Sequence, residues 1–375
     1  MHRVVLVSVR IVALMALLMA TQVSLSSLSG AQDLSALVSL AAPALTPTVA
    51  PSSKPNIPLP PPSHPLPPAS REFREFSRSM PECRPGEQGR PSPFPDVNGC
   101  RAIGVAGDSS IRRPRTTDLP RPPVRSILSL LPVPTAEASD LGDLLVGYPR
   151  HGCCWRASMG TGQGRDPWWN LPQYGTGGDN YGSYAQIWVP GASVPPTAPG
   201  LAMGSLLDFF NSTGYPGGGA DEVGWVITSR PPLNCPADGL AHPFTDNFVG
   251  GFRCFPYITL AAGSWHSFAT IALGGGQWGN YWYNPAWGWT ALDIRTGMPD
   301  ASSGHDHGIE VSLDCCVSGS TTYLYGVQQL RTLGGAWTLV DAVQPAYSFA
   351  NWSSAPPTVR IELVQAHFNF WAYGP

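Results

Sequence analysis

Short runs of alternating apolar and polar residues, each bounded by glycine, proline or asparagine, recur along the second half of the chain. Alternation is the pattern of a half-buried β-strand, because successive strand side chains point to opposite faces of the sheet. Glycine and proline are poor helix formers, and the 375-residue chain has 41 of each. Many short strands joined by turns predict an all-β sandwich. The expected strands cover residues 184–189, 222–228, 257–260, 266–273, 280–283, 290–294, 308–313, 338–343 and 359–363.

The sandwich domain is expected over residues 145–375, as antiparallel sheets of the concanavalin or jelly-roll type. Every tryptophan of the chain lies in this part, from Trp155 onward. The best helical stretch in it, residues 201–210, is short. Residues 274–276 are three glycines between two expected strands, which predicts a hairpin turn.

The first 31 residues have the features of a secretory signal peptide. Basic His2 and Arg3 precede an apolar run over residues 11–20, and small residues follow at 29–31. A retained membrane anchor is the alternative, although the run is shorter than the roughly 20 residues that span a bilayer. We therefore expect a secreted, extracellular protein that is not membrane-bound once the signal is removed.

Residues 32–144 are expected to form a disordered, proline-rich linker or pro-region. Eleven prolines lie between residues 41 and 70, a composition that favours polyproline II and cannot build a core. Residues 71–140 stay rich in Arg, Pro and Ser, and we expect little regular structure there apart from a short helix near 126–131.

The charge balance and the cysteines narrow the class of protein. The 22 basic and 25 acidic residues nearly cancel, which argues against a nucleic-acid partner.

Eight cysteines predict disulfides in an oxidising compartment, with Cys83–Cys100 and Cys235–Cys254 as local loops and the adjacent pairs linked to other segments. A zinc site is the competing interpretation, but no CxxC or HxxxH spacing occurs. The remaining cysteines are Cys153, Cys154, Cys315 and Cys316, and the glycosylation tripeptides begin at Asn211 and Asn351.

The strand expected at 222–228 carries an acidic residue on an otherwise apolar segment. Alternation places Val223, Trp225 and Ile227 on the core face, and Glu222 with Gly224 on the other face. A carboxylate beside a residue without a side chain leaves room for a ligand to approach the sheet.

A second carboxylate, Glu310, lies in the strand expected at 308–313. Ile309, Val311 and Leu313 point one way there, and Glu310 points the other way. Two strand carboxylates that face one groove suit general acid and base chemistry. Solvated glutamates on surface strands are the alternative.

The sequence Ala-Gln-Ile-Trp-Val at 185–189, followed by Asp-Glu-Val-Gly-Trp-Val at 221–226, resembles the neprosin family of secreted glutamic peptidases. The resemblance extends over roughly residues 170–315 and includes Cys235 and Cys254, the Trp-rich segment 277–283 and the Glu-Val of the later strand. The family has Trp and Gly before its second glutamate, where this chain has His-Asp-His-Gly-Ile at 305–309.

The resemblance implies a β-sandwich endopeptidase that cleaves polypeptides, preferably next to proline, at acidic pH. Its catalytic pair would be Glu222 and Glu310, with no metal and no other cofactor. The sequence predicts no particular oligomeric state. Aromatic residues near these glutamates and in the Trp-rich strand are the candidate substrate contacts: Trp225, Trp278, Trp282 and Tyr283.

Two other functions stay open from the residues alone. Exposed Trp and Tyr side chains on a sheet could bind a polysaccharide, and a structural extracellular module needs no site at all. His305-Asp306-His307 is compatible with a metal site, but a polar loop before the strand is the preferred interpretation. The tryptophans that could form a sugar-stacking platform are Trp168, Trp169, Trp278, Trp282, Trp287 and Trp289.

Overall fold

The computed structural model describes parts of the unit Leu59–Pro375. The described residues are 64–84, 92–107, 154–162, 164–165, 172–173, 180–194, 200–210, 220–229, 234–247, 251–312, 317–340, 347–350, 360–365 and 369–374. The expected signal peptide, the helix expected at 126–131, Trp168, Trp169 and both expected glycosylation tripeptides lie outside them. No helix of the described residues is long and apolar enough to cross a membrane.

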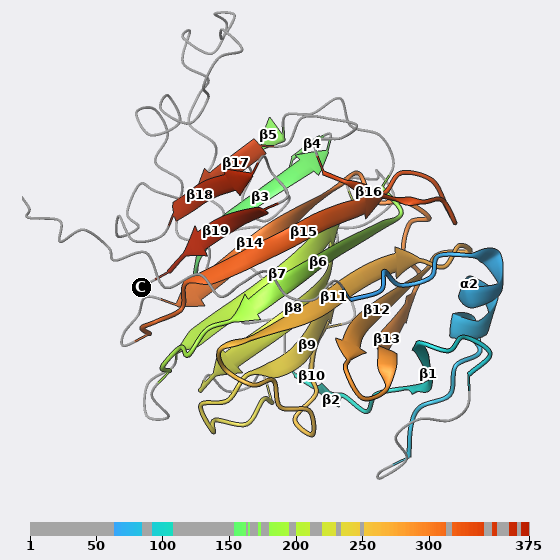
Figure 1. Cartoon of the computed structure of the whole chain (residues 1–375), viewed down its shortest axis with the longest axis horizontal. Coiled ribbons are helices and arrows are strands. Elements are labelled where there is room, and N and C mark those ends of the chain that lie inside the picture. Colours follow the sequence, from blue (N-terminus) through green and yellow to red (C-terminus); the bar gives the residue numbers. More distant parts are fainter. Residues whose placement is uncertain are drawn as a thin grey trace, which may run out of the picture. The chain divides into compact units, whose positions relative to one another are not determined.

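Two large sheets make up this unit, as the alternating runs predicted (Figure 1). Sheet A contains, in spatial order, β1 (Val97–Arg101), β13 (Gly288–Thr296), β12 (Gln277–Asn284), β11 (Ser264–Ala272), β6 (Gly182–Val189), β15 (Thr322–Leu330), β19 (Asn369–Tyr373) and β18 (Arg360–Gln365), with β16 (Trp337–Leu339) paired to β15. Sheet B contains β17 (Tyr347–Ala350), β3 (Cys154–Gly162), β14 (Gly304–Ser312), β7 (Leu201–Phe209), β8 (Ala220–Thr228), β9 (His242–Asn247), β10 (Gly251–Cys254) and β2 (Val105–Ala106). The short strands β4 (Gly164–Arg165) and β5 (Pro172–Gln173) pair with each other.

The main core lies between the two sheets. Ile187 and Phe268 of sheet A pack in one cluster with Trp225 and Ile309 of sheet B, and all four side chains are fully buried. The named strand pairs are antiparallel except β1 and β13, which are parallel. The all-β sandwich is therefore confirmed.

The stretch with the best helical pattern in this part of the chain, residues 201–210, is not a helix, because Leu201–Phe209 is strand β7. Its residues alternate between two buried faces. Leu201 and Met203 pack against Phe244 and Phe252 on the outside of sheet B, whereas Ala202 and Leu206 enter the core between the sheets. A strand that is buried on both faces reads as a continuous apolar run, which periodicity cannot tell from a helix.

Two expectations about turns have opposite outcomes. Residues 257–260 are not a strand: Tyr257 lies in a turn and is 81% exposed, and only Leu260 forms an isolated bridge, with Ala241. The glycines at 274–276 do connect β11 to β12, and all three have positive φ angles, between 64° and 81°. Positive φ is accessible to glycine at little cost.

Residues 64–107 correct the expectation that the chain has little regular structure before residue 145. They form helix α2 (Arg71–Arg78), strand β1 at the edge of sheet A and strand β2 at the edge of sheet B. Phe73 of α2 is fully buried against the outside of sheet A, in a second hydrophobic cluster with Tyr281 and Trp289. Composition did not predict this because the strands that pair with β1 and β2 lie far away in sequence, at Trp289 for Val97 and at Cys254 for Val105.

The two expected local disulfides, Cys83–Cys100 and Cys235–Cys254, are confirmed. The first lies within the N-terminal segment, and the second joins β10 to the segment before β9. The partners expected for Cys153, Cys315 and Cys316 lie outside the described residues, as does the side chain of Cys154.

Candidate functional site

Glu222 and Glu310 lie on one face of sheet B, the outer face that points away from sheet A. Their strand neighbours Val223 and Ile309 enter the core between the sheets, as the alternation predicted. The Glu222 side chain is 0% exposed and that of Glu310 is 4% exposed. Strand β7 runs between the two glutamate strands, β8 and β14.

A row of three small residues crosses this outer face at the middle strand. Ser205 of β7 pairs with Gly224 of β8 on one side and with Gly308 of β14 on the other. The strands approach so closely that a Cβ built at Gly224 would lie 2.0 Å from the carbonyl oxygen of Gly204. The row has only one short side chain, which lets another backbone come close to the sheet.

Strand register determines which carboxylates surround the row. Glu222 and Asp306 both pair with Leu207 of β7, from opposite sides, so their Cα atoms lie about two strand spacings, or about 10 Å, apart. Glu310 pairs with Met203, four residues further along β7, which puts its Cα about 16 Å from that of Glu222. Sequence reasoning considered Asp306 only as a candidate metal ligand and missed its position level with Glu222, because register cannot be read from alternation.

Ser205 holds the Glu222 carboxyl group. The Ser205 hydroxyl donates a hydrogen bond to Glu222 Oε1 over 2.5 Å, a length typical of a hydroxyl that donates to a carboxylate. On the next strand, Asp246 pairs directly with Glu222 and is also fully buried. The outer face of sheet B therefore carries four acidic side chains around one serine, of which the sequence analysis named Glu222 and Glu310 as the catalytic pair and Asp306 only as a candidate metal ligand.

The four predicted substrate-contact residues do not lie on this face, which is a correction. Trp225 and Trp282 are buried in the core between the sheets, and Trp278 is buried there too, near one end. Tyr283 lies on the outer face of sheet A. Trp225 is three residues from Glu222 in the same strand, and odd spacing sends side chains to opposite faces.

His305, Asp306 and His307 are part of strand β14, which corrects their interpretation as a polar loop. The two histidine rings lie between the sheets, with centroids 4.4 Å apart, and His305 Nε2 contacts Gln329 Oε1 of sheet A at 3.0 Å. Asp306 points to the opposite face, so the three side chains cannot bind one ion. Burial lowers the pKa of His305 to about 4.

A polar cluster between the sheets surrounds Asp208 of β7. Burial raises the pKa of this carboxyl to about 6, although four hydrogen bonds oppose the rise. The donors are Thr270 Oγ1, Ser183 Oγ at 3.0 Å, Ser302 Oγ at 3.1 Å and Asn180 Nδ2 at 2.5 Å.

Asp221 of β8 pairs directly with Asp208 and faces the same space. Burial raises its pKa to about 8, against the opposing effects of Arg295 and of the Asn280 amide, which donates to Asp221 Oδ1 over 3.0 Å. The sequence did contain a signal for this residue. Asp221 and Glu222 are consecutive in a strand, so they must face opposite sides.

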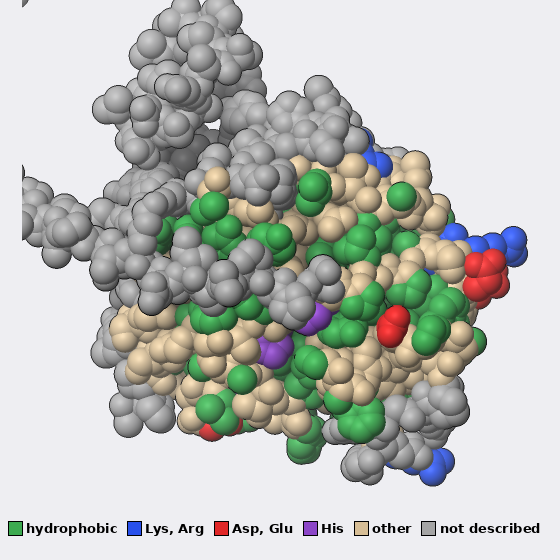
Figure 2. Space-filling view, viewed as in Figure 1, with side chains coloured by type: hydrophobic (Ala, Val, Ile, Leu, Met, Phe, Trp, Pro, Cys, Tyr) green, Lys and Arg blue, Asp and Glu red, His purple; other side chains and the backbone are tan. Residues whose placement is uncertain are grey.

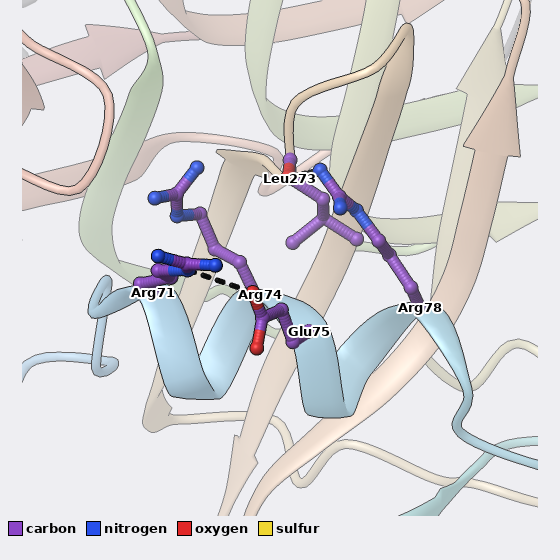
Figure 3. A pocket seen from close by; sticks show the side chains of 5 residues that line it. All are labelled: Arg71, Arg74, Glu75, Arg78 and Leu273. Atoms are coloured by element: carbon purple, nitrogen blue, oxygen red, sulfur yellow. Dashed lines mark hydrogen bonds and ion pairs between the residues drawn. The ribbon is translucent and has the colours of Figure 1, made fainter.

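The described residues offer two other candidate sites, a metal site and a pocket, and neither has an arrangement that suggests a reaction. Among the described residues, no group of three His, Cys, Asp or Glu side chains is arranged to hold a metal ion. A pocket of about 270 Å³ lies beside α2 (Figure 3). Arg71 pairs there with Glu75 over 2.8 Å, and Arg78 donates to the Leu273 carbonyl, so two of its three arginines are engaged within the chain.

Among the described residues, the aromatic side chains do not form the flat platform that a polysaccharide-binding module would use. Figure 2 shows hydrophobic side chains spread over the strands of sheet A, with charged ones gathered at the edge where α2 lies. Trp278, Trp282 and Trp289 are buried, whereas Trp287 is 41% exposed. Trp265 meets Trp188 at 65° and Tyr323 at 88°, so these rings pack edge to face.

The structure is similar to solved glutamic peptidases at low identity. Scytalido-glutamic peptidase bound to a transition state analog inhibitor aligns with a TM-score of 0.40 and 12% identity, over 59% of this chain and 98% of that one. SCP-B, a member of the eqolisin family of peptidases in a complex with the tripeptide Ala-Ile-His, gives 0.36 and 13%, over the same shares. A functionally unknown protein from Saccharomyces cerevisiae gives 0.24 and 12%, over 41% and 78%. No family model and no curated protein matches the chain, and membership of the neprosin family stays a prediction.

Proposed function

We propose that this chain is a secreted endopeptidase that hydrolyses polypeptides at acidic pH with carboxyl groups on the outer face of sheet B. The observation that carries the proposal is the position of Glu222. It is buried, its carboxylate is held by the Ser205 hydroxyl, and it borders a row of residues with almost no side chains. An extended peptide backbone could lie over that row. A preference for bonds next to proline rests on the resemblance alone.

The proposed reaction uses two carboxyl groups and one water. One ionised carboxylate removes a proton from the water as its oxygen bonds to the scissile carbonyl carbon. The other carboxyl, still protonated, gives its proton to the leaving nitrogen as the C–N bond breaks. Because the two groups start in different protonation states, activity is expected at acidic pH. The scheme needs no metal and no cofactor.

The second carboxyl group is either Glu310 or Asp306. The neprosin resemblance supports Glu310, whereas register supports Asp306, which is level with Glu222 across a single strand. Asp306 and Glu310 are on the same strand and the same face, so the two versions of the site share the outer face of sheet B. Individual substitutions of these residues distinguish between them.

Access to the site has to be part of the proposal, because Glu222 and Asp306 are both 0% exposed. A substrate can reach them only if this face of sheet B opens. We therefore expect the full chain to be weakly active as secreted and to gain activity after incubation in acid or after limited proteolysis.

The test is digestion of a denatured, proline-containing polypeptide by the purified chain, before and after acid incubation. Glu222→Gln keeps the size of the side chain and the Oε1 acceptor for Ser205, and should lower the rate by about 10²- to 10⁴-fold. The true partner, Asp306→Asn or Glu310→Gln, should cause a similar loss, and the double variant should be little worse than Glu222→Gln alone. Asp300→Asn is the matched control, because Asp300 is an exposed aspartate in the segment between β13 and β14.

Three results would reject the proposal. One is a wild-type chain that cleaves nothing between roughly pH 2 and 7 after acid or protease treatment. Another is a folded Glu222→Gln variant that digests substrate at the wild-type rate. The third is full activity in both Asp306→Asn and Glu310→Gln, which would exclude a two-carboxyl mechanism on this face.

A further inference from the structure

Residues 64–69, His-Pro-Leu-Pro-Pro-Ala, lie across the outer face of sheet A and lead into α2 (Figure 1). We call them the strap. Proline has no backbone N–H, so this segment cannot join the sheet as a paired strand. Tryptophan side chains hold it instead: Trp289 Nε1 donates to the Pro65 carbonyl over 3.0 Å, and Trp337 Nε1 donates to the Pro67 carbonyl over 2.8 Å.

Four aromatic side chains in mutual contact and one serine lie under the strap, and we call this set the cradle: Tyr184, Ser267, Tyr283, Trp289 and Trp337. The Tyr184 ring centroid lies 6.0 Å from that of Trp289 and 6.1 Å from that of Trp337. One tyrosine ring therefore packs against both indoles that donate to the strap. Tyr283 packs against Trp289 at 5.4 Å. These contacts fix the two N–H groups at one spacing.

The first residue of the strap makes two specific contacts with the cradle. The His64 ring stacks on Tyr283, with centroids 4.6 Å apart and planes 26° from parallel, and His64 Nδ1 lies 2.8 Å from Ser267 Oγ. Pro67 and Ala69 are buried at the other end, whereas Pro65 and Leu66 are exposed. The strap therefore contacts the cradle through two of its backbone carbonyls, through the His64 ring and through its buried apolar end.

This is the chemistry by which aromatic grooves recognise polyproline II peptides. Such ligands have a preformed backbone that loses little entropy on binding, and they are held by aromatic packing with side-chain donors to their carbonyls. We propose that the cradle is a recognition site for extended proline-rich peptides of the His-Pro-x-Pro type, and that the strap is its resident ligand, bound in cis. The site lies on the opposite sheet from Glu222, so it does not depend on the proposed peptidase activity.

A resident ligand competes with any peptide from outside, because its linkage gives it an effective concentration of about a millimolar. The test therefore uses the full chain with a loosened strap, the triple variant His64→Ala, Pro65→Gly, Pro67→Gly. The probe is a synthetic peptide with the sequence of residues 62–70, followed by calorimetry or tryptophan fluorescence. We expect saturable binding that is at least about tenfold tighter than to the wild-type chain. A peptide with glycine in place of every proline should not bind.

A matched pair of tryptophan variants identifies the donor. In the loosened chain, Trp337→Phe keeps an aromatic ring but removes the N–H, and should weaken peptide binding about fivefold or more. Trp278→Phe is the control, since Trp278 Nε1 donates in the same way to the Pro299 carbonyl, away from the cradle. Equal binding of the proline and glycine peptides, no saturable binding, or equal effects of the two tryptophan variants would overturn the proposal.

A second measurement covers the case in which the loosened chain does not fold. Trp337→Phe is then made in the otherwise wild-type chain, and hydrogen exchange is followed at the amide of Arg74, which donates to the Ser70 carbonyl in the first turn of α2, directly after the strap. Faster exchange than in Trp278→Phe would support the indole as the group that holds the strap. Unchanged exchange in Trp337→Phe would reject it.

Discussion

Asp208 and Asp221 are directly paired across strands β7 and β8, and both carboxyl groups are fully buried between the two sheets. Burial is the largest cause of the raised pKa of each group, and the negative charge of Asp208 also raises the pKa of Asp221. The protein therefore folds more favourably when these two carboxyl groups are protonated. The stability of the sandwich is tied to pH through a site that no proposed chemistry uses.

Replacing Asp221 with asparagine should stabilise the protein at neutral pH. The folded pKa of Asp221 is about 8, against an ordinary value of 3.8. Its stabilising effect is therefore complete below about pH 4 and is lost as pH rises toward 8, by up to about 1.4 kcal/mol per pH unit. Urea unfolding of Asp221→Asn should show a flatter profile over this window. Asp300→Asn, which is exposed, is the control, and an identical pH slope in wild type and Asp221→Asn would contradict the assignment.

His305 should produce the opposite slope on the acid side. Burial lowers its pKa from 6.5 to about 4, so its stabilising effect is complete above pH 6.5 and is lost as pH falls toward 4. His305→Gln removes the titration, and its unfolding free energy should fall less than that of wild type between these two pH values. The comparison with wild type at pH 7.5 measures the cost of the substitution itself. A variant that loses stability in acid as steeply as wild type would show that His305 is not responsible.

Gly224→Ala should be strongly destabilising, by roughly 3 kcal/mol or more, because the added Cβ would lie 2.0 Å from the Gly204 carbonyl oxygen and 2.8 Å from the Ser205 Cα. Backbone atoms on both sides leave nothing flexible to yield. Gly191→Ala is the control, since nothing lies within 4 Å of a Cβ there. Thermal unfolding of the two variants checks the prediction, and equal midpoints would mean that β7 and β8 are further apart than described.

Limited proteolysis should leave residues 64–84 and 92–107 bound to the sandwich. They contribute α2 and two edge strands, and Phe73 and Val97 are buried against sheet A. After any cut between residues 107 and 154, the two pieces should elute together in native size exclusion and separate in denaturant. Mass spectrometry of the resistant material gives the answer. A resistant product that begins near residue 145 and lacks Phe73 would contradict this view of the fold.

Sequence alone predicted the strands with one polar and one apolar face. Residues 222–228 are the clearest case, because Glu222 and Trp225 need different surroundings and alternation separates them. Strand β7 was missed because apolar side chains lie on both of its faces. Helix α2 with its strap was missed because the tryptophans that donate hydrogen bonds to the strap lie more than 200 residues away. The role of Asp306 as a partner for Glu222 was missed for a different reason. Only the pairing of β7 with both β8 and β14 brings it level with Glu222.

The placement of β1 and β2 has a consequence for how separate molecules meet. β1 is the last strand at one edge of sheet A, and β2 is the last strand at one edge of sheet B. Both come from a single stretch, residues 97–106. A chain that began after residue 107 would therefore present β13 and β10 as unpaired edges at the same time. Open edges recruit strands from other molecules, so loss of this stretch would expose β10 and the longer strand β13 to pairing with neighbouring copies.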